Sequence, residues 1–367
     1  MISGAIATHT QIGPVSISII GNSPVSGIFS SQLEAVQASN GAPLADLEVV
    51  FLKSKSELPP YIPAIYSAKA LMSFNDSSLF VGYHPNFDYL LENPFGTGPT
   101  KLYLISKKVS YIRSLYAGPR RVVESVLSYQ LFWYVFHLAL QKKGGSFFHA
   151  SVLECNGEAV AMTGTGGGGK TSSLFHLLDT NPQTRYLAED FGVIDGDGIA
   201  HYNPKHVSIY DSDTRQNLLK GCIDRELSIT KRVAWSSRKH LLHKNPRLKV
   251  SPRSVIGNDR IGSQARLKQA FFMVRGEYDA ISVARISSDE LIDRTLHVTY
   301  REMKFLVELS RLVSANKPAS MPHLSPDELV ARNREIYQAA FGEIDSMIIR
   351  IPSTFGPERI TPFIWGI

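Results

Sequence analysis

The sequence predicts an α/β fold in which helices accompany sheets of mixed strand direction. Three observations lead to this prediction. Over the first 115 residues, short apolar runs alternate with clusters of Gly, Pro, Asn and Ser, a pattern typical of strands joined by turns. At 164–169 a glycine-rich stretch lies between an apolar run and a segment with helical spacing. Near the C-terminus, helix-start signals alternate with apolar runs of strand length.

Length and composition indicate a globular chain with more than one domain. It has 367 residues, of which 43% are apolar and 20% charged. Because strand patterns give way to helical spacing near Pro119, we expect a smaller β-rich N-terminal domain at 1–118 and a larger domain at 119–367. The two cysteines, Cys155 and Cys222, imply no disulfide scaffold and indicate a reducing compartment, so we expect a cytoplasmic protein.

The sequence does not favour a membrane protein. The first 21 residues lack a basic region and are interrupted by Thr, Gln, Gly and Pro, which makes them a poor signal peptide. The most apolar run, Leu127 to Gln141, is shorter than the roughly 20 residues that a membrane span needs. We therefore expect β-structure at the N-terminus and a buried helix at the apolar run.

The first elements follow from their periodicity. The expected strands of the N-terminal domain lie at 15–20, 47–52 and 101–112, and no catalytic motif accompanies them. A helix is expected next, ending at 142–145, where two lysines are followed by two glycines. Its apolar residues recur at steps of three and four: Val122, Val126, Tyr129, Trp133 and Phe136.

A hairpin then leads into the glycine-rich stretch. The apolar runs on either side of Asn156 and Gly157 predict two strands joined by a tight turn, because this dipeptide adopts the positive φ angles that such turns need. After the glycines, apolar residues at 174, 175, 177 and 178 predict a helix. The order of strand, glycine loop and helix is the one that phosphate-binding loops require.

The glycine stretch itself matches a phosphate-binding motif. Residues 164–171, GTGGGGKT, fit G-x-x-x-x-G-K-[ST] at every position. Glycines let backbone N–H groups turn toward a phosphate, and the start of the following helix adds further N–H groups. Lys170 is expected to bridge the β- and γ-phosphates, and the Thr171 hydroxyl to bind Mg²⁺. A flexible linker would give no reason for Lys and Thr at this spacing. The residues expected to hold the nucleotide are Gly164, Thr165, Gly166, Gly167, Gly168, Gly169, Lys170, Thr171 and Ser172.

Two adjacent carboxylates occur about twenty residues after Lys170. Glu189 and Asp190 end a short apolar run, and adjacent side chains of an extended segment point to opposite sides. One carboxylate could then take the metal while the other reaches a second group. Asp195 and Asp197 follow with glycines between them and are interpreted as a hairpin turn. His149 would lie beside the loop if its strand pairs with 159–164, although a histidine between apolar residues is more often a core residue.

The remaining elements lie toward the C-terminus. Runs at 269–274 and 279–286 predict adjacent strands joined by a turn at 275–278. Two helices are expected to begin where Ser is followed three residues later by Glu, at Ser287 and Ser325. A last strand is expected at 346–352.

Positive charge is concentrated between Lys205 and Lys268, which hold 15 Lys and Arg against 5 Asp and Glu. Such a segment could face a polyphosphate, an acidic protein or nucleic acid, or be a solvated surface. Nucleic-acid binding is disfavoured because few aromatic residues are interleaved with the charges. Arg215, Arg247 and Lys249 are candidates for clamping phosphate or acceptor.

The segment 147–178, FFHASVLECNGEAVAMTGTGGGGKTSSLFHLL, followed by 186–194, YLAEDFGVI, resembles the HPr serine kinase family and HPr-kinase-related proteins. Their nucleotide fold is similar to that of phosphoenolpyruvate carboxykinases. In that family a His-Ala or His-Gly strand leads into the phosphate loop, and a later strand ends in Asp-Asp. The resemblance covers residues 120–215 and continues more loosely to about 300.

The resemblance implies an ATP- and Mg²⁺-dependent kinase that transfers the γ-phosphate to a hydroxyl. Glu189 stands in the place of the catalytic Asp, His149 in that of the histidine near the transferred phosphate, and Lys170 in that of the loop lysine. Asp190 takes the neighbouring position, so that Thr171 and Asp190 would hold the metal. Because HPr kinases form rings, a homo-oligomer is implied.

Two departures from the family pattern leave the acceptor open. Gly166 replaces the usual Ser of the loop, and Glu189 is one methylene longer than Asp. The longer C-terminal signature of HPr kinases is absent, which favours another acceptor: a protein or peptide serine, or a small-molecule alcohol. The N-terminal domain is, by its position, the expected place for substrate choice.

The sequence leaves other functions besides the kinase open. The alternative is a nucleotide-dependent binding module or switch with little kinase activity, which the two departures and the basic segment support. A regulatory GTPase is disfavoured because the chain has no Asn-Lys-x-Asp. A carboxykinase-like lyase ranks lower still, since no metal-binding set is visible beyond the loop region.

Overall fold

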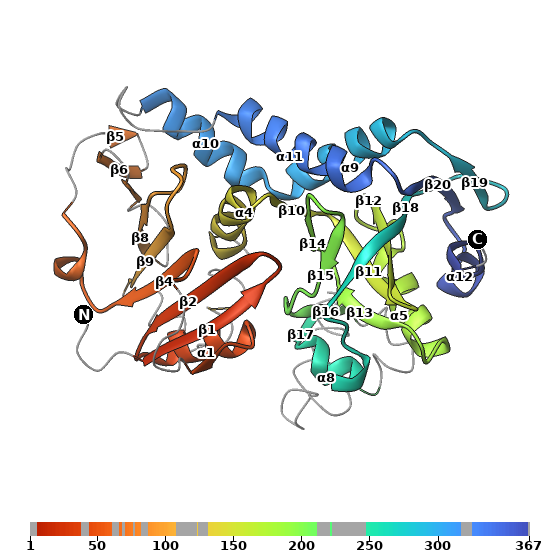
Figure 1. Ribbon diagram of the computed structural model, residues 1–367, viewed down its shortest axis with the longest axis horizontal. Helices are drawn as coiled ribbons and strands as arrows, with labels where there is room; N and C mark the ends of the chain where they lie inside the picture. The colour runs from red at the N-terminus through yellow and green to blue at the C-terminus, as the bar shows by residue number, and fades with distance from the viewer. Residues whose placement is uncertain are drawn as a thin grey trace, which may run out of the picture. The chain divides into compact units, whose positions relative to one another are not determined.

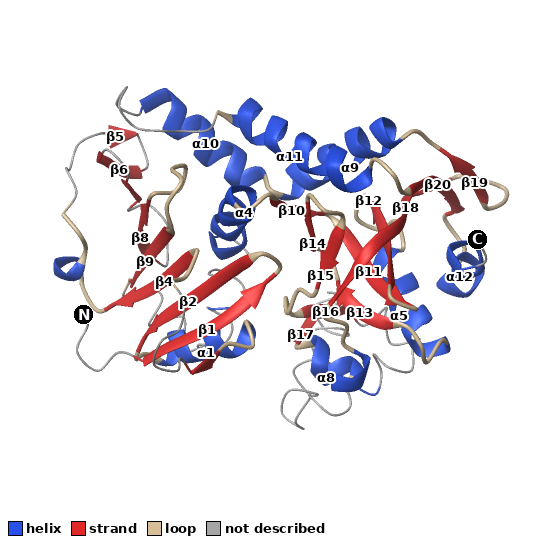
Figure 2. Cartoon of the chain, in the orientation of Figure 1, coloured by secondary structure: helices blue, strands red, loops and turns tan. Residues whose placement is uncertain are grey.

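The computed structural model describes residues 6–37, 44–60, 66–67, 70–75, 78–81, 87–107, 123, 131–210, 221, 247–316 and 325–365. It confirms the α/β class, with sheets of mixed strand direction and helices (Figures 1 and 2). The chain divides into two compact units. The first comprises residues 1–146 and 300–335, and the second residues 147–299 and 336–367.

The first unit is built on a nine-stranded sheet of order β3-β1-β2-β4-β9-β8-β7-β6-β5. Its strands β2, β4 and β9 are parallel, and the others pair antiparallel. The elements are β1 (Ile6–Ile12), β2 (Val15–Gly21), α1 (Pro24–Gln32), β3 (Val36–Gln37), β4 (Leu47–Leu52), η1 (Lys55–Glu57), β5 (Tyr66–Ser67), β6 (Ala70–Asn75), β7 (Ser78–Val81), β8 (Phe87–Glu92) and β9 (Thr100–Ser106). The strands predicted at 15–20 and 47–52 are confirmed, and the one predicted from 101 is β9, whose predicted end lies outside the described residues.

The first unit contains helices from two parts of the chain that are far apart in sequence, 133–142 and 304–335. These are α4 (Trp133–Lys142), α10 (Lys304–Asn316) and the beginning of α11 (Pro326–Phe341). In α4, Gln141 Nε2 donates to the carbonyl of Leu329 at 3.0 Å and to Asn333 Oδ1 at 2.6 Å. Lys142 Nζ donates to the carbonyls of Asn93 and Gly98 at 2.5 and 3.0 Å. These contacts explain why the compact units do not follow the predicted boundary at residue 118.

In the structure this helix ends within the range that the sequence predicts, 142–145. Helix α4 ends at Lys142, and Gly144 has a φ of 70°, a conformation that favours glycine. The apolar positions Val122, Val126 and Tyr129 that predict the earlier part of this helix lie outside the described residues.

The second unit contains the hairpin, the glycine loop and the following helix in the predicted order. Its sheet runs β10-β14-β15-β18-β12-β11-β13, with β20 paired to β18 and β19 paired to β20. The elements are β10 (Gly145–Phe148), β11 (Ala150–Cys155), β12 (Glu158–Gly164), α5 (Lys170–Thr180), β13 (Arg185–Ala188), β14 (Gly192–Asp195), β15 (Ile199–His201), β16 (Val207–Tyr210), β17 (Arg247–Val250), α8 (Pro252–Ile256), η4 (Asn258–Arg260), β18 (Gln264–Gly276), β19 (Ser282–Arg285), α9 (Ser288–Glu302), β20 (Asp345–Pro352) and α12 (Pro357–Trp365).

Turn and cap chemistry place several of these elements. Asn156 and Gly157 have φ angles of 53° and 83°, and Cys155 pairs with Glu158 across the predicted turn. The Ser287 hydroxyl accepts from the Glu290 amide at 3.1 Å, and the Ser325 hydroxyl from the Glu328 amide at 3.2 Å. Both predicted helix starts are thus confirmed.

The predicted adjacency of the strands at 269–274 and 279–286 is wrong. β20 lies between them, parallel to β18 and antiparallel to β19. Burial gives the reason. The residues of β20 are mostly buried, including Ile349 and Ile351, whereas β19 is mostly exposed and suits the edge of a sheet.

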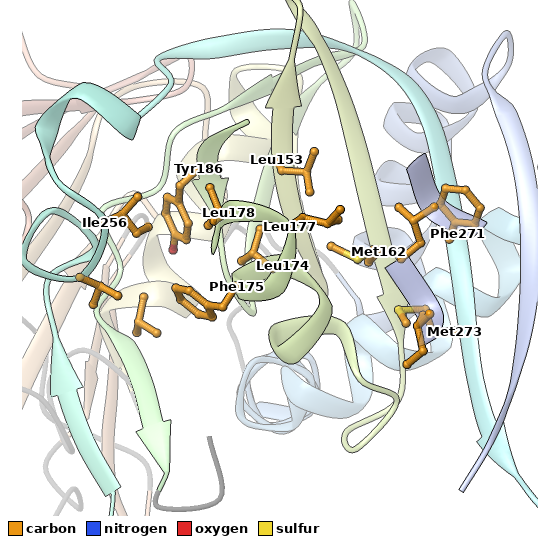
Figure 3. Close-up of a cluster of buried hydrophobic side chains, with 14 of the residues drawn as sticks. Leu153, Met162, Leu174, Phe175, Leu177, Leu178, Tyr186, Ile256, Phe271 and Met273 are labelled. Atoms are coloured by element: carbon orange, nitrogen blue, oxygen red, sulfur yellow. The ribbon is translucent and has the colours of Figure 1, made fainter. Parts of the chain in front are cut away.

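A buried cluster holds α5 against the sheet (Figure 3). Helix α5 contributes Leu174, Phe175, Leu177 and Leu178 to it. The sheet contributes residues of β11, β12, β13 and β18: Leu153, Met162, Tyr186, Phe271 and Met273. Burying each such side chain stabilises the fold by about 1.5–3 kcal/mol. The start of α5, and with it the end of the glycine loop, is therefore fixed on a packed surface.

Candidate functional site

The glycine loop connects the end of β12 to the start of α5, and its glycines are needed for two different reasons. Gly167 and Gly169 have φ angles of 79° and 96°, which residues with a Cβ rarely adopt. Gly164 has a φ of 136° and also lies against β18, where a Cβ would come within 2.4 Å of the Met273 carbonyl oxygen. The loop can therefore keep its shape only with glycine at these positions.

Gly166 and Gly167 offer a matched pair of substitutions. A Cβ at either position would meet no atom within 4 Å, but φ is positive only at Gly167. We expect Gly167→Ala to lower the free energy of unfolding by about 1–2 kcal/mol. Gly166→Ala or Gly166→Ser should be neutral, or stabilising by about 0.4–1 kcal/mol, because the unfolded chain loses freedom. Denaturant unfolding measures both values, and an equal loss in the two alanine variants would contradict the loop geometry.

Lys170 is buried inside the loop. Its Nζ donates to the carbonyls of Gly164 at 2.8 Å and Thr165 at 3.0 Å. The side chain thus lies inside the glycine loop, next to the backbone groups that would surround a phosphate. Ser172 turns back toward the same loop, because its hydroxyl donates to the Gly169 carbonyl at 3.0 Å.

Thr171 is hydrogen-bonded to a carboxylate that directly follows β13. Its hydroxyl donates to Glu189 Oε1 at 2.8 Å, and the Glu189 side chain is buried. Burial raises the pKa of Glu189, and the neighbouring Asp190 carboxylate raises it further. Lys205, the Thr171 hydroxyl and Lys170 oppose this rise.

The prediction that Glu189 and Asp190 lie on an extended segment is wrong, because the chain turns at these two residues. The Phe191 amide donates to the Glu189 carbonyl at 2.9 Å, and Asp190 has a φ of 71°. This is the rarer, strained form of γ-turn, and such strain is concentrated at functional sites. The turn directs the two neighbouring carboxylates to different partners.

Asp190 faces two groups that carry or can carry positive charge. Its Oδ2 accepts from Lys205 Nζ at 2.5 Å, and its Oδ1 lies 3.3 Å from His149 Nδ1. Burial raises the pKa of Asp190, but Lys205 and His149 outweigh it and hold the pKa well below its usual value. The side chain of Lys205 is only 2% exposed, and its Nζ lies 4.9 Å from the ring centroid of Phe191.

Backbone hydrogen bonds place His149 next to the loop. It precedes β11, its amide donates to Thr299 Oγ1 at 3.1 Å, and its carbonyl accepts from Thr163 Oγ1 at 3.0 Å. The imidazole is buried, and within the described part of the chain neither Nδ1 nor Nε2 makes a hydrogen bond, so Nδ1 lies at ion-pair distance from Asp190 without hydrogen-bond geometry. Such orphaned polar atoms are uncommon, and in other proteins strain, a catalytic role, or a bound water or ion accounts for them.

One pocket of about 380 Å³ brings these groups together. It is lined by most of the residues that the sequence predicts: Gly166, Gly167, Gly168, Gly169, Lys170, Thr171, Ser172, Glu189, Asp190 and His149. Gly164 and Thr165 do not line it, but their carbonyls hold Lys170.

Sequence reasoning missed three residues of this site. Ser208 and Arg275 line the pocket, and Lys205 holds Asp190. Arg275 lies at the end of β18, whose parallel pairing with β12 has no local signal. Of the three basic candidates, Lys249 is buried and pairs across the strands with Ser208, Arg215 lies outside the described residues, and the structure does not describe the Arg247 side chain.

Asp195 and Asp197 have the structural role that the sequence predicts. The chain turns between β14 and β15, and Asp195 Oδ1 accepts from the amides of Asp197 and Ile199, both at 3.0 Å. Its Oδ2 lies 2.7 Å from His201 Nε2.

Comparisons with known proteins do not add to this geometry. No protein-family model matches the chain, and no curated protein matches it. In the described ranges no helix is long and apolar enough to cross a membrane. The same ranges contain no group of three or more His, Cys, Asp or Glu that could hold a metal ion.

Proposed function

We propose that the protein is an ATP- and Mg²⁺-dependent kinase, related to HPr kinases, that transfers the γ-phosphate to a hydroxyl. The observation that carries the proposal is the gathering of three parts in one pocket. These are the glycine loop with Lys170, the contact of Thr171 with Glu189, and the contact of Asp190 with His149. A site that only binds Mg²⁺ and a nucleotide would need the first two parts, so the third part favours phosphoryl transfer.

The residues around Thr171 fit Mg²⁺. Mg²⁺ prefers oxygen ligands, and proteins commonly supply one or two of them while substrate phosphates and water supply the rest. The hydroxyl of Thr171 and the carboxylate of Glu189 are such ligands and already lie side by side. Bound there, Mg²⁺ would neutralise charge on the transferring phosphoryl group.

The contacts favour a division of roles that differs from the one expected from the sequence. Glu189 contacts Thr171 and is therefore assigned to the metal, whereas Asp190 contacts His149 and is assigned to the acceptor side. Asp190 orients the imidazole, and the unpartnered Nε2 of His149 takes the proton of the acceptor hydroxyl. Lys170 stabilises the charge that develops on the phosphate oxygens.

The switch remains the competing function, and one experiment separates it from the kinase. The protein is incubated with γ-labelled ATP, Mg²⁺ and a lysate of its source, and the products are divided into protein, peptide, metabolite and inorganic phosphate. We expect label on a protein, peptide or metabolite. Label that is found only in inorganic phosphate, or that stays on ATP, would favour the switch. The contact between His149 and Asp190 favours the kinase because a candidate base beside the loop is more than nucleotide binding alone requires.

Three further proposals follow from the sequence. We place the reaction in the cytoplasm because of the low cysteine content. We assign the choice of acceptor to the N-terminal part of the chain, and the resemblance to HPr kinases favours a homo-oligomer.

A further inference from the structure

Arg275 lies where the sheet meets the glycine loop. β12 and β18 are parallel, and Gly164 at the end of β12 pairs with Met273. Arg275 is thus two residues further along β18, at the carboxyl edge of the parallel strands. Ligands of α/β sheets bind at this edge. Arg275 also lines the same pocket as Lys170 and Thr171.

The guanidinium group of Arg275 is anchored through one nitrogen, while a second nitrogen has no hydrogen-bond partner within the described residues. Its Nη1 donates to the Ser353 carbonyl at 3.0 Å, and the Ser353 amide donates to the Gly276 carbonyl at 2.9 Å. Its Nε is buried and has no hydrogen-bond partner within the described residues. Its Nη2 lies against the loop, because a Cβ at Gly169 would be 3.1 Å from it.

Nε and Nη2 together form one edge of the guanidinium plane. Two parallel N–H groups on that edge match two oxygens of a phosphate, a geometry that lysine cannot reproduce. The edge lies beside Gly169, directly before the first turn of α5, where free N–H groups and the helix dipole favour an anion.

We propose that Arg275 binds a phosphate of the nucleotide through its Nε and Nη2, with Nη1 held by Ser353. The inference rests on the proposed function, because it assumes that a nucleotide occupies the glycine loop. It adds a phosphate-binding residue from β18 to those of the loop. Gly169 is glycine because of its positive φ, and the guanidinium lies beside it.

The test measures the affinity for ATP, with Mg²⁺ present, by titration calorimetry on the full chain. We expect Arg275→Ala to weaken binding by about 10- to 100-fold, the usual effect of losing a hydrogen bond to a charged group. Arg275→Lys should recover only a part of the loss. The matched control is Arg285→Ala on β19, which is separated from β18 by β20; the Arg285 side chain is 78% exposed, and its loss should leave the affinity unchanged.

Chemical rescue distinguishes direct binding from an effect on loop shape. We expect millimolar guanidinium ion to restore ATP affinity to Arg275→Ala but not to alter the wild type. Unchanged affinity in Arg275→Ala would overturn the inference, as would a loss that guanidinium does not restore in a variant with wild-type thermal unfolding. If the wild type itself does not bind ATP, the proposed function fails instead.

Discussion

Replacing Lys170 by Ala is expected to lower the rate of phosphoryl transfer by about 10²- to 10³-fold, since removal of one preorganised electrostatic contact to a transition state has an effect of this size. Lys170 is the cation within the loop, and its Nζ already lies 2.8 Å from the Gly164 carbonyl and 3.0 Å from that of Thr165. The rate is measured by the transfer of label from γ-labelled ATP to the acceptor under saturating nucleotide.

The fold should survive this substitution. The two hydrogen bonds of Nζ contribute about 1 kcal/mol each, and the core under α5 is untouched. Lys268→Ala on the exposed face of β18 serves as the control and should transfer phosphate at the wild-type rate. Equal transfer by Lys170→Ala and the wild type would contradict the assignment of the loop.

The second large effect concerns the two neighbouring carboxylates, whose amide variants should change stability in opposite directions. Asp190→Asn leaves Lys205, whose side chain is 2% exposed, without its carboxylate, and should lower the free energy of unfolding by about 3 kcal/mol. Asn tolerates the positive φ of 71°, so strain does not contribute. Glu189→Gln keeps an oxygen for the Thr171 hydroxyl and removes a buried charge, so it should stabilise the unliganded protein by about 0.5–2 kcal/mol.

The pH dependence gives this prediction a second readout. Because burial raises the pKa of Glu189, the folded protein holds a proton at pH values where the unfolded chain has released it. Stability from this group is lost as pH rises through the raised pKa, so the gain in Glu189→Gln should be larger at about pH 8 than at about pH 4. The pKa of Asp190 is lowered, so its contribution is present above the usual 3.8 and is lost as pH falls below it.

Denaturant unfolding in the presence of a metal chelator measures both variants without bound nucleotide. Destabilisation by Glu189→Gln that is independent of pH would contradict the raised pKa. An equal loss of stability in both variants would contradict the prediction that the ion pair with Lys205 makes Asp190 the more important of the two carboxylates for stability.

The parts of the site that the sequence predicts well are those whose signals are local. The Asn156 and Gly157 turn, the glycine loop and the helix after it each depend on residues that lie next to one another in the chain. Ser287 and Ser325 likewise cap helices through contacts within three residues. Local hydrogen bonds and allowed φ angles decide such features, so a single sequence suffices.

The parts that the sequence could not supply depend on pairing between distant segments. Arg275 reaches the loop only because β18 pairs with β12, and Lys205 reaches Asp190 only through the fold of the chain after β15. The position of β20 between β18 and β19 reflects relative burial, which the apolar character of both runs did not distinguish. The γ-turn at Asp190 is strained, and propensity does not predict strained backbone.

The most direct test of the proposed site is the Mg²⁺ dependence of ATP binding, measured by calorimetry with and without the metal in the wild type, Glu189→Gln and Asp190→Asn. Tighter binding with Mg²⁺ is expected in the wild type and in Asp190→Asn, and this gain should be largely lost in Glu189→Gln, since Glu189 contacts Thr171. A wild type that does not bind ATP, or a gain that is lost in Asp190→Asn but kept in Glu189→Gln, would contradict it.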